Sequence, residues 1–153
     1  MKITGFGVRR IAKNELAGLV ELYRHLHDSD DPLPGGAELA VVWGEFLADP
    51  KIHCLVAVED SGRLVATCTL VVVPNLTRGA RPYGLIENVV VRTDCQRRGI
   101  GKALMQHAVE VAWEANCYKV MLMTGAERES AHRFYESCGF VGGVKVGFEV
   151  RGE

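Results

Sequence analysis

The chain has 153 residues, which is long enough for one domain to bury a hydrophobic core without disulfides or a structural metal. Its 18 Lys and Arg residues nearly balance its 19 Asp and Glu residues, which excludes bulk attraction to nucleic acid or to an anionic membrane as the basis of function. We therefore expect a single domain over residues 1–153, with no nucleic-acid partner and no membrane partner.

The sequence predicts neither a membrane span nor a secretory leader. Its longest apolar runs fall far short of the roughly 20 residues that a span requires, and MKITGFGVRR at the start lacks a leader-like apolar stretch. The five cysteines are scattered and show no CxxC pair or zinc-finger spacing, which favours reduced, buried thiols. We interpret the chain as a cytoplasmic protein that binds no metal.

The first third of the chain predicts one strand and two helices. Residues 4–10 are compatible with a short strand, and apolar residues at helical spacing predict a helix over residues 14–26. The turn formers of DSDDPLPGG predict a loop over residues 28–36. A second helix is expected over residues 37–48, because Pro50 would stop it.

The middle of the chain predicts an antiparallel meander. IHCLVAVEDSGRLVATCTLVVV, from Ile52, contains two β-rich runs joined by a turn over residues 59–62, which is typical of a hairpin. YGLIENVVV, residues 83–91, predicts a third strand after a loop over residues 74–82.

The last part alternates helices and strands. A helix is expected over residues 99–116, a buried strand over 118–123 and another helix over 128–137 that stops at Gly139. A strand, a helix and a strand in this order imply a parallel pair. FVGGVKVGFEV, residues 140–150, predicts one or two closing strands. The expected class is α/β (α+β), with a mixed, mostly antiparallel twisted sheet flanked by helices.

The stretch VRTDCQRRGIGKAL places two glycines where a strand turns into a helix. Such a turn suits a phosphate, because a helix N-terminus carries unpaired N–H groups and the positive end of the helix dipole. The dinucleotide-binding pattern fails because Leu104 stands where it requires glycine. The P-loop pattern fails at Gln96 and Ala103, where it requires Gly and then Ser or Thr.

The remaining pattern, Q-x-x-G-x-G, is met by Gln96, Gly99 and Gly101. It resembles the acetyl-coenzyme A signature of the GNAT N-acetyltransferase superfamily. HRFYESCGF resembles the FYE…GF ending of a helix in the same family, at the expected place in the chain. The resemblance covers residues 85–140 strongly and the whole chain in the order of its elements, and it implies the GNAT acyl-CoA N-acyltransferase fold.

The resemblance implies acetyl-CoA as cosubstrate and no metal. The turn would wrap the pyrophosphate, and the preceding strand would offer backbone groups to the pantetheine arm and the thioester carbonyl. Arg97, Arg98 and Lys102 are alternatively solvated surface charges. The residues expected to bind the cosubstrate are Val89, Val90, Val91, Gln96, Arg97, Arg98, Gly99, Ile100, Gly101 and Lys102.

Two residues are the expected catalytic groups. Glu87 lies in a mostly apolar strand, where the family often places a general base, and semi-burial would suit it to that role. The alternative is that it pairs with an arginine or faces solvent. Tyr135 matches the family tyrosine that acts as general acid near the coenzyme A sulfur, and the alternative is a packed aromatic residue.

The acceptor is not determined by the fold. We predict an acetyl-CoA-dependent N-acetyltransferase that acts on a primary amine of a small molecule by direct attack in a ternary complex. The strand and helix segments look most like the glucosamine-phosphate N-acetyltransferase branch, with Arg78, Arg81 and Asn88 as candidate substrate ligands. A non-catalytic acetyl-CoA-binding module is the rival class. A homodimer is expected, because the glycine-bent C-terminal strands suit pairing or exchange across a two-fold axis.

Overall fold

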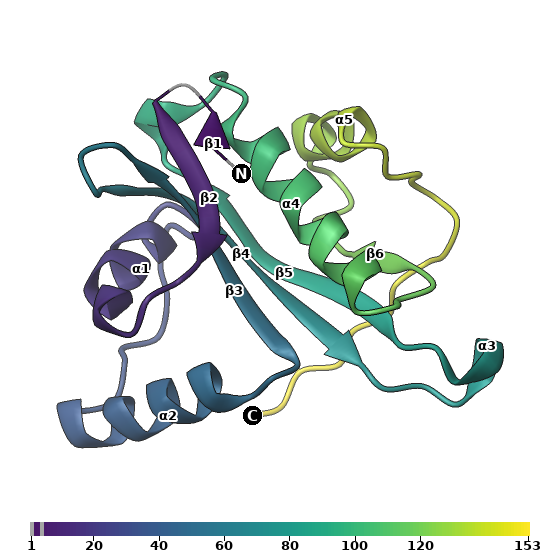
Figure 1. Cartoon of the computed structure of the whole chain (residues 1–153), viewed down its shortest axis with the longest axis horizontal. Helices are drawn as coiled ribbons and strands as arrows, with labels where there is room; N and C mark the ends of the chain where they lie inside the picture. The colour runs from purple at the N-terminus through teal and green to yellow at the C-terminus, as the bar shows by residue number, and fades with distance from the viewer. Residues whose placement is uncertain (1, 4) are drawn as a thin grey trace.

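A computed structural model describes residues 2–3 and 5–153, and these residues form one six-stranded sheet with helices on both faces (Figure 1). The order is β1-β2-β3-β4-β5-β6; β5 and β6 are parallel and every other pair is antiparallel. The strands are β1 (Lys2–Ile3), β2 (Phe6–Arg10), β3 (Ile52–Glu59), β4 (Leu64–Val73), β5 (Tyr83–Val91) and β6 (Val120–Leu122). The helices are α1 (Leu16–Tyr23), α2 (Gly36–Ala48), α3 (Thr77–Ala80), α4 (Ile100–Glu114) and α5 (Glu129–Ser137).

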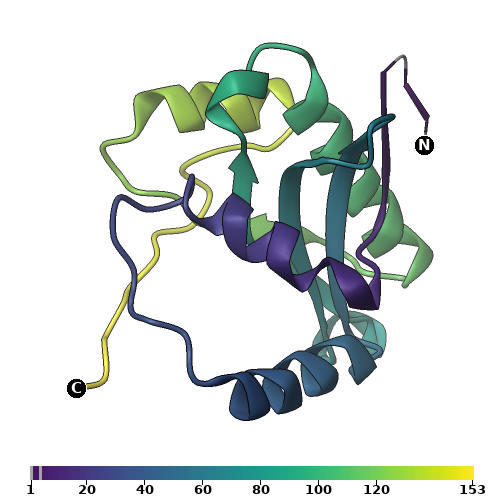
Figure 2. The ribbon, with the colours of Figure 1, turned by 90° about the vertical axis from the view of Figure 1, so that its left-hand side faces the viewer.

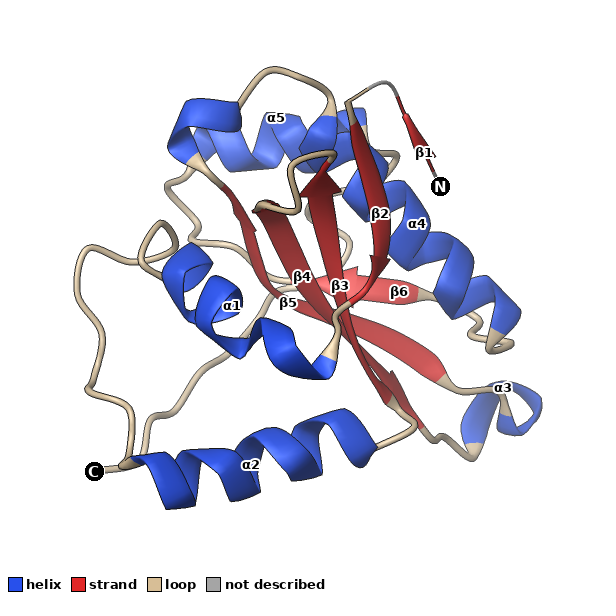
Figure 3. Ribbon diagram, turned by 60° about the vertical axis from the view of Figure 1, so that its left-hand side comes forward, coloured by secondary structure: helices blue, strands red, loops and turns tan. Residues whose placement is uncertain are grey.

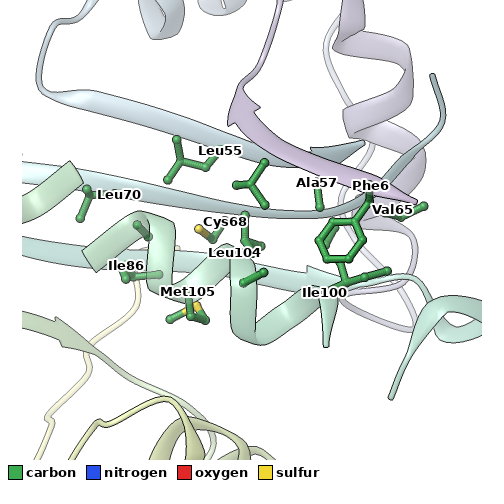
Figure 4. Packing of buried hydrophobic residues seen from close by; sticks show 14 of the residues in the cluster. Phe6, Leu55, Ala57, Val65, Cys68, Leu70, Ile86, Ile100, Leu104 and Met105 are labelled. Atoms are coloured by element: carbon green, nitrogen blue, oxygen red, sulfur yellow. The ribbon is translucent and has the colours of Figure 1, made fainter. Parts of the chain in front are cut away.

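The sheet is buried on both faces, because α1 and α2 cover one face and α4 and α5 the other (Figure 3). The middle strands are therefore apolar at nearly every position, rather than at alternate positions as in a sheet with one wet face. On the α4 face, Leu104 and Met105 pack against Leu55, Leu70 and Ile86 (Figure 4). This packing holds α4 rigidly beside β5.

Two irregularities of β5 create an opening in the sheet. β6 pairs with β5 only through Gly84–Ile86, so beyond Ile86 β5 has β4 alone as its neighbour among the described residues. The β4–β5 register then shifts: Thr69 pairs with Glu87 and Thr67 with Val90, which leaves one extra residue on β5. Asn88 has a φ of 52°, in the left-handed region. This β-bulge changes the direction of β5 where its second neighbour is lost.

Most predicted elements are present, with different bounds. The first strand is Phe6–Arg10, and Thr4 of the predicted range lies outside the described residues. The first helix is split, because a 3-10 turn at Lys13–Glu15 precedes α1, which ends at Tyr23. The loop before β5 contains the short helical turn α3. None of the helices formed by the described residues is long and apolar enough to cross a membrane.

The predicted closing strands are wrong for the isolated chain. Residues 140–153, all of which the structure describes, form neither a strand nor a helix. Figure 2 shows this yellow segment leaving α5 and running down to the C-terminus outside the sheet. The physical reason is that a strand needs a neighbouring strand to bond its backbone groups, and the segment pairs with none in its own chain.

Candidate active site

The open half of β5 is the first component of the candidate site. Val90 packs on the α1 side of the sheet, whereas Val89 and Val91 pack on the α4 side. Side chains therefore hold this half of the strand on both faces, while its edge on the β6 side has no strand partner among the described residues. An extended chain of amides can pair with such an edge as an added strand would.

The turn after β5 is the second component. Arg97 and Gly99 have φ values of 63° and 76°, both in the left-handed region, and α4 begins directly afterwards at Ile100. No side chain caps this helix, so its first N–H groups point into the turn without an intrahelical partner. The turn therefore has backbone donors that suit an anion, and its role in binding the cosubstrate stays a prediction.

Gly101 is required for close packing behind the turn. A Cβ atom at this position would lie 3.0 Å from Phe134 Cζ and 3.2 Å from Val91 Cγ2. The glycine thus allows the first turn of α4 to approach both β5 and α5. Ile100 is buried in the core, which anchors the same turn from the other side.

The three basic residues of the turn differ in their surroundings. Arg98 Nη1 donates a hydrogen bond to Glu59 Oε1 at 3.0 Å, so this guanidinium ties the turn to the β3–β4 hairpin. Glu59 also accepts a hydrogen bond from Arg63 Nε at 3.0 Å, and both bonds lower the pKa of its carboxyl group. Arg97 and Lys102 are exposed at the surface of the turn. Of the predicted charges, Arg98 has a structural partner and the other two face solvent.

Glu87 is exposed rather than semi-buried, which corrects the expectation from its apolar strand. The reason is that Glu87 lies just past the last β6 pair, where the sheet opens. It pairs in register with Thr69, and Thr69 pairs with Cys54. Directly opposed residues share a face, so the Glu87 side chain lies on the α1 side of the sheet.

The sequence did not indicate the Thr69 hydroxyl, which lies beside Glu87 in the strand pairing. Thr69 is 6% exposed, and its Oγ1 lacks a hydrogen-bond partner within the described chain. Burial raises the pKa of the nearby Tyr23 hydroxyl to about 12, with a smaller contribution from the Cys54 sulfur, and the proximity of Thr69 opposes this rise. The available signal was Thr67 and Thr69, two hydroxyls at alternate positions of an otherwise apolar strand.

Tyr135 approaches the sheet from the opposite face. It lies on α5, packs against the α4-side core and contacts the ring of Phe140 edge-on, with centroids 6.2 Å apart. Burial is the main cause that raises the pKa of its hydroxyl, and the Glu87 carboxylate adds to the rise. The residue is therefore both a packed aromatic and a hydroxyl that stays protonated at neutral pH.

A comparison with protein families matches residues 13–140 to the acetyltransferase (GNAT) family. The chain belongs to the GNAT acetyltransferase family. The known members that it resembles are named N-acetyltransferases, and this GNAT chain is an N-acetyltransferase. The family uses acetyl-CoA as cosubstrate.

The relatives include named amino-sugar enzymes. A glucosamine 6-phosphate N-acetyltransferase of Trypanosoma brucei brucei is 32% identical over 138 residues, which cover 90% of this GNAT chain and 90% of that relative. A probable glucosamine 6-phosphate N-acetyltransferase 2 of Oryza sativa subsp. japonica is 32% identical over 139 residues. The match covers 88% of this chain and 81% of that relative.

A solved structure of similar sequence is also described as an acetyltransferase. A putative acetyltransferase from Agrobacterium tumefaciens superposes with a TM-score of 0.89 at 48% identity, over 95% of this chain and 99% of its own. The predictions of the family, the fold class and an N-acetyltransferase are confirmed.

The GNAT fold does not bring all predicted substrate ligands together. Asn88 is exposed at the bulge, beside Glu87. Arg81 donates hydrogen bonds to the carbonyl oxygens of Asn116, at 3.3 Å, and Cys117, at 3.1 Å. It lies six residues before Glu87, which is about 20 Å along an extended chain. Arg78 lies farther still along the chain, in α3, so the assignment of both arginines to the acceptor stays a prediction.

A groove of about 600 Å³ runs along α1 and is lined in part by the loop before α2. The charged residues of the groove are Glu21 and Arg24. Across the described chain, no three His, Cys, Asp or Glu side chains are placed to hold a metal ion.

Proposed function

We propose that the protein transfers the acetyl group of acetyl-CoA to a primary amine of a small molecule, by direct attack in a ternary complex. The observation that carries this proposal is the open half of β5, which leads directly into the uncapped N-terminus of α4. An extended amide chain that ends in a pyrophosphate matches this order of strand edge and anion site.

The proposed mechanism uses both faces of the sheet. Acetyl-CoA supplies the activated acyl group. Backbone N–H groups along residues 87–91 orient the bound arm, and those of the turn bind its phosphates. Glu87 accepts the proton that the amine must lose before it attacks. The C–N bond forms and the C–S bond breaks, and the Tyr135 hydroxyl donates a proton to the departing sulfur. The second proton that the nitrogen loses on becoming an amide restores the tyrosine.

The placement of these two groups supports direct transfer. Glu87 lies on the α1 face and Tyr135 packs on the α4 face, so the base and the acid approach the open edge from opposite sides. An acceptor that enters beside α1 then meets the acyl group while the thiol lies beside α5. The arrangement needs both substrates at once, as a ternary complex provides.

For the acceptor we propose glucosamine 6-phosphate. The names of the relatives from Trypanosoma brucei brucei and Oryza sativa subsp. japonica support this choice, since each covers more than four fifths of the chain. Arg24 in the α1 groove is a further candidate for the sugar phosphate, beside the predicted Arg78 and Arg81.

We also propose that the enzyme works as a cytoplasmic homodimer of one domain, residues 1–153. All five cysteines are free and four of them are buried. Free thiols are typical of cytoplasmic proteins, which supports a cytoplasmic location. Exposed apolar side chains near the C-terminus support the dimer.

The deciding experiment measures thiol release from acetyl-CoA by the purified protein. Glucosamine 6-phosphate is compared with polyamines, amino acids, aminoglycosides and peptides, while a thermal-shift assay records acetyl-CoA binding. Release with the sugar phosphate alone supports the proposed acceptor. Release only with another amine overturns that acceptor but keeps the enzyme, and a thermal shift without release from any amine favours a non-catalytic module.

A further inference from the structure

Thr69 places a buried hydroxyl at a position of β4 where an apolar side chain would pack equally well. The residue is 6% exposed, and no described residue forms a hydrogen bond with its Oγ1 atom. Thr67, two positions earlier on the same face, gives the contrast, because its Oγ1 donates a hydrogen bond to the Leu55 carbonyl oxygen at 2.9 Å. A buried hydroxyl without a partner costs free energy that a valine of nearly the same shape would not. Of the two hydroxyls of β4, only that of Thr69 is left unexplained by the fold.

The cross-strand row that contains Thr69 ends at Glu87. Cys54 on β3 pairs with Thr69, and Thr69 pairs with Glu87 on β5, so the three side chains share the face that α1 covers. The neighbouring row runs through Thr67 and ends at Val90, which is 5% exposed. Of these two rows, the one with the unpartnered hydroxyl leads to a carboxylate at the open edge of the sheet.

The Glu87 carboxylate lacks a partner of the kind that Thr69 can supply. It accepts no hydrogen bond and forms no ion pair within the part of the chain that the structure describes. A carboxylate only accepts hydrogen bonds, whereas a threonine hydroxyl has one proton to donate. Directly opposed residues of an antiparallel pair have Cα atoms about 4.5–5.5 Å apart, so their side chains can meet. A donor without an acceptor therefore lies opposite an acceptor without a donor.

Two other polar groups lie near the Thr69 hydroxyl, and both are compatible with a bond to Glu87. They are the Tyr23 hydroxyl and the Cys54 thiol. A threonine oxygen also has two lone pairs, so it can accept a hydrogen bond from Tyr23 and still donate to a carboxylate. Sulfur is a weak acceptor, whereas hydrogen bonds to an ionised group are about twice as strong as those between neutral groups. The carboxylate is therefore the preferred acceptor of the Thr69 proton.

We propose that Thr69 is a positioning residue, whose hydroxyl donates a hydrogen bond to the Glu87 carboxylate once acetyl-CoA covers the open edge of β5. Bound arm and acyl group exclude water from this edge, which favours a partner within the protein over a water molecule. Catalytic hydrogen bonds are often long or misaligned in a free enzyme and tighten only in the complex. The bond would hold an otherwise exposed carboxylate on the α1 side, where the amine is proposed to enter. The inference rests on the proposed role of Glu87 as the base and holds for any acceptor amine.

The first test compares Thr69→Val with Thr67→Val. Both changes remove a hydroxyl from the same strand face and keep the shape of the side chain. We expect Thr69→Val to lower kcat about tenfold, because a hydrogen bond to a charged group is lost. The KM for acetyl-CoA and the melting temperature should stay near their wild-type values. Thr67→Val should lower the melting temperature and leave kcat near the wild-type value.

Thr69→Ser and a double variant separate positioning from packing. Thr69→Ser keeps the hydroxyl and should recover most of the wild-type kcat. When Thr69→Val is added to Glu87→Gln, kcat should fall no further, because the hydroxyl acts only through the base. A merely structural role of Thr69 predicts the same loss in both backgrounds.

A third test needs no turnover. In protein with carbon-13 in its glutamate side chains, the Glu87 carboxyl signal is assigned by its absence from Glu87→Gln. At neutral pH and saturating acetyl-CoA, this signal should be displaced in Thr69→Val and should keep its wild-type position in Thr67→Val. The comparison reports the hydrogen bond itself, whichever amine the enzyme acetylates.

Three outcomes would overturn the proposal. They are a wild-type kcat in Thr69→Val, an equal loss of kcat with and without the Glu87 carboxylate, and a carboxyl signal that Thr69→Val leaves in place. Thiol release and the acetyl-CoA thermal shift are recorded separately. A chain that binds acetyl-CoA but releases no thiol with any amine contradicts the proposed function, while the carbon-13 comparison still decides whether Thr69 bonds to Glu87.

Discussion

Glu87 shows how a change in the strand around a residue alters the surroundings of its side chain. Up to Ile86, β5 is flanked by strands on both sides, and at Glu87 one neighbour ends. A carboxylate before this point would face a packed sheet, whereas at this point it meets solvent, from which the proposed amine would approach. The register with Thr69 fixes its direction toward α1.

Replacement of Glu87 by glutamine tests the base. We expect kcat to fall about 10²- to 10⁴-fold, because the amide keeps the shape of the side chain but cannot accept the amine proton. The KM for acetyl-CoA should stay near its wild-type value, since in the proposed mechanism the arm binds to backbone groups. Steady-state kinetics and the acetyl-CoA thermal shift check both statements. An unchanged kcat would remove Glu87 from the mechanism.

The pH dependence of kcat tests whether Tyr135 is the general acid. Because burial raises the pKa of its hydroxyl, the proton is available at neutral pH and is lost only above the ordinary tyrosine value of about 10. We expect Tyr135→Phe to lower kcat at neutral pH while it preserves the packing against Phe140. A pH profile of kcat should lose part of its alkaline decline in the variant. If the two profiles have the same shape, another group donates the proton.

The residues of the site differ in how far sequence alone could identify them. Glu87, Tyr135 and the turn glycines belong to local patterns, so the sequence alone names them as candidates. The unsatisfied hydroxyl of Thr69 was not found, because its place beside Glu87 depends on the β4–β5 register and on the bulge within it. The ion pair of Arg98 with Glu59 joins residues 39 positions apart and leaves no local signal.

At the level of elements, the turn before α4 is supported by a hairpin far away in the sequence. Glu59 ends β3 and accepts hydrogen bonds from both Arg63 and Arg98. Arg63 also bonds the Asp94 carboxylate at 3.0 Å, and Asp94 precedes the turn. The β3–β4 hairpin therefore braces the turn at two points, which keeps its backbone donors in one arrangement.

Loss of this brace should affect cosubstrate binding more than chemistry. In Glu59→Gln, we expect KM for acetyl-CoA to rise about two- to fivefold, as exposed ion pairs of this kind contribute modestly. The value of kcat should change little, because Glu59 touches no reacting group. Glu15→Gln, which breaks the Arg9–Glu15 ion pair elsewhere on the surface, is the control. An equal change in both variants would show that the brace has no specific role.

Gly101 joins three elements, and its substitution tests their packing. Gly101→Ala places a methyl group against Phe134 and Val91, so we expect a loss of about 1–3 kcal/mol in the free energy of unfolding. The melting temperature should fall by several degrees, as about 2–4 °C accompanies each kcal/mol in a chain of this size. Gly44→Ala is the control, since nothing lies within 4 Å of its Cβ position in α2. Equal stability of the two variants would contradict the packing argument.

Over the whole molecule, the sequence predicted the mixed sheet and its flanking helices, because the patterns that define them repeat within each element. It did not predict the split sheet, in which β6 pairs over three residues only. The C-terminal segment shows the limit most clearly. Its alternating apolar residues predict a strand, yet a strand exists only with a neighbour, and the single chain provides none. Pattern determines the kind of element, whereas pairing depends on the whole assembly.

The stability of the whole fold should show an alkaline decline that begins in the α1 face. Burial raises the pKa of Tyr23 to about 12, so the folded state holds this proton more tightly than the unfolded chain, where tyrosine titrates near 10. The stabilisation is complete below about pH 10 and is lost as the pH rises toward 12, by about 3 kcal/mol in all.

Tyr23→Phe removes this titration and tests it directly. Urea unfolding between pH 8 and 11 should show a shallower decline for the variant, while the buried Cys68 thiol, whose pKa is also raised to about 12, continues to contribute from about pH 9 in both proteins. The difference between the two curves isolates Tyr23, since the phenyl ring fills the same space. Parallel curves over this range would show that the Tyr23 hydroxyl titrates alike in the folded and unfolded chains.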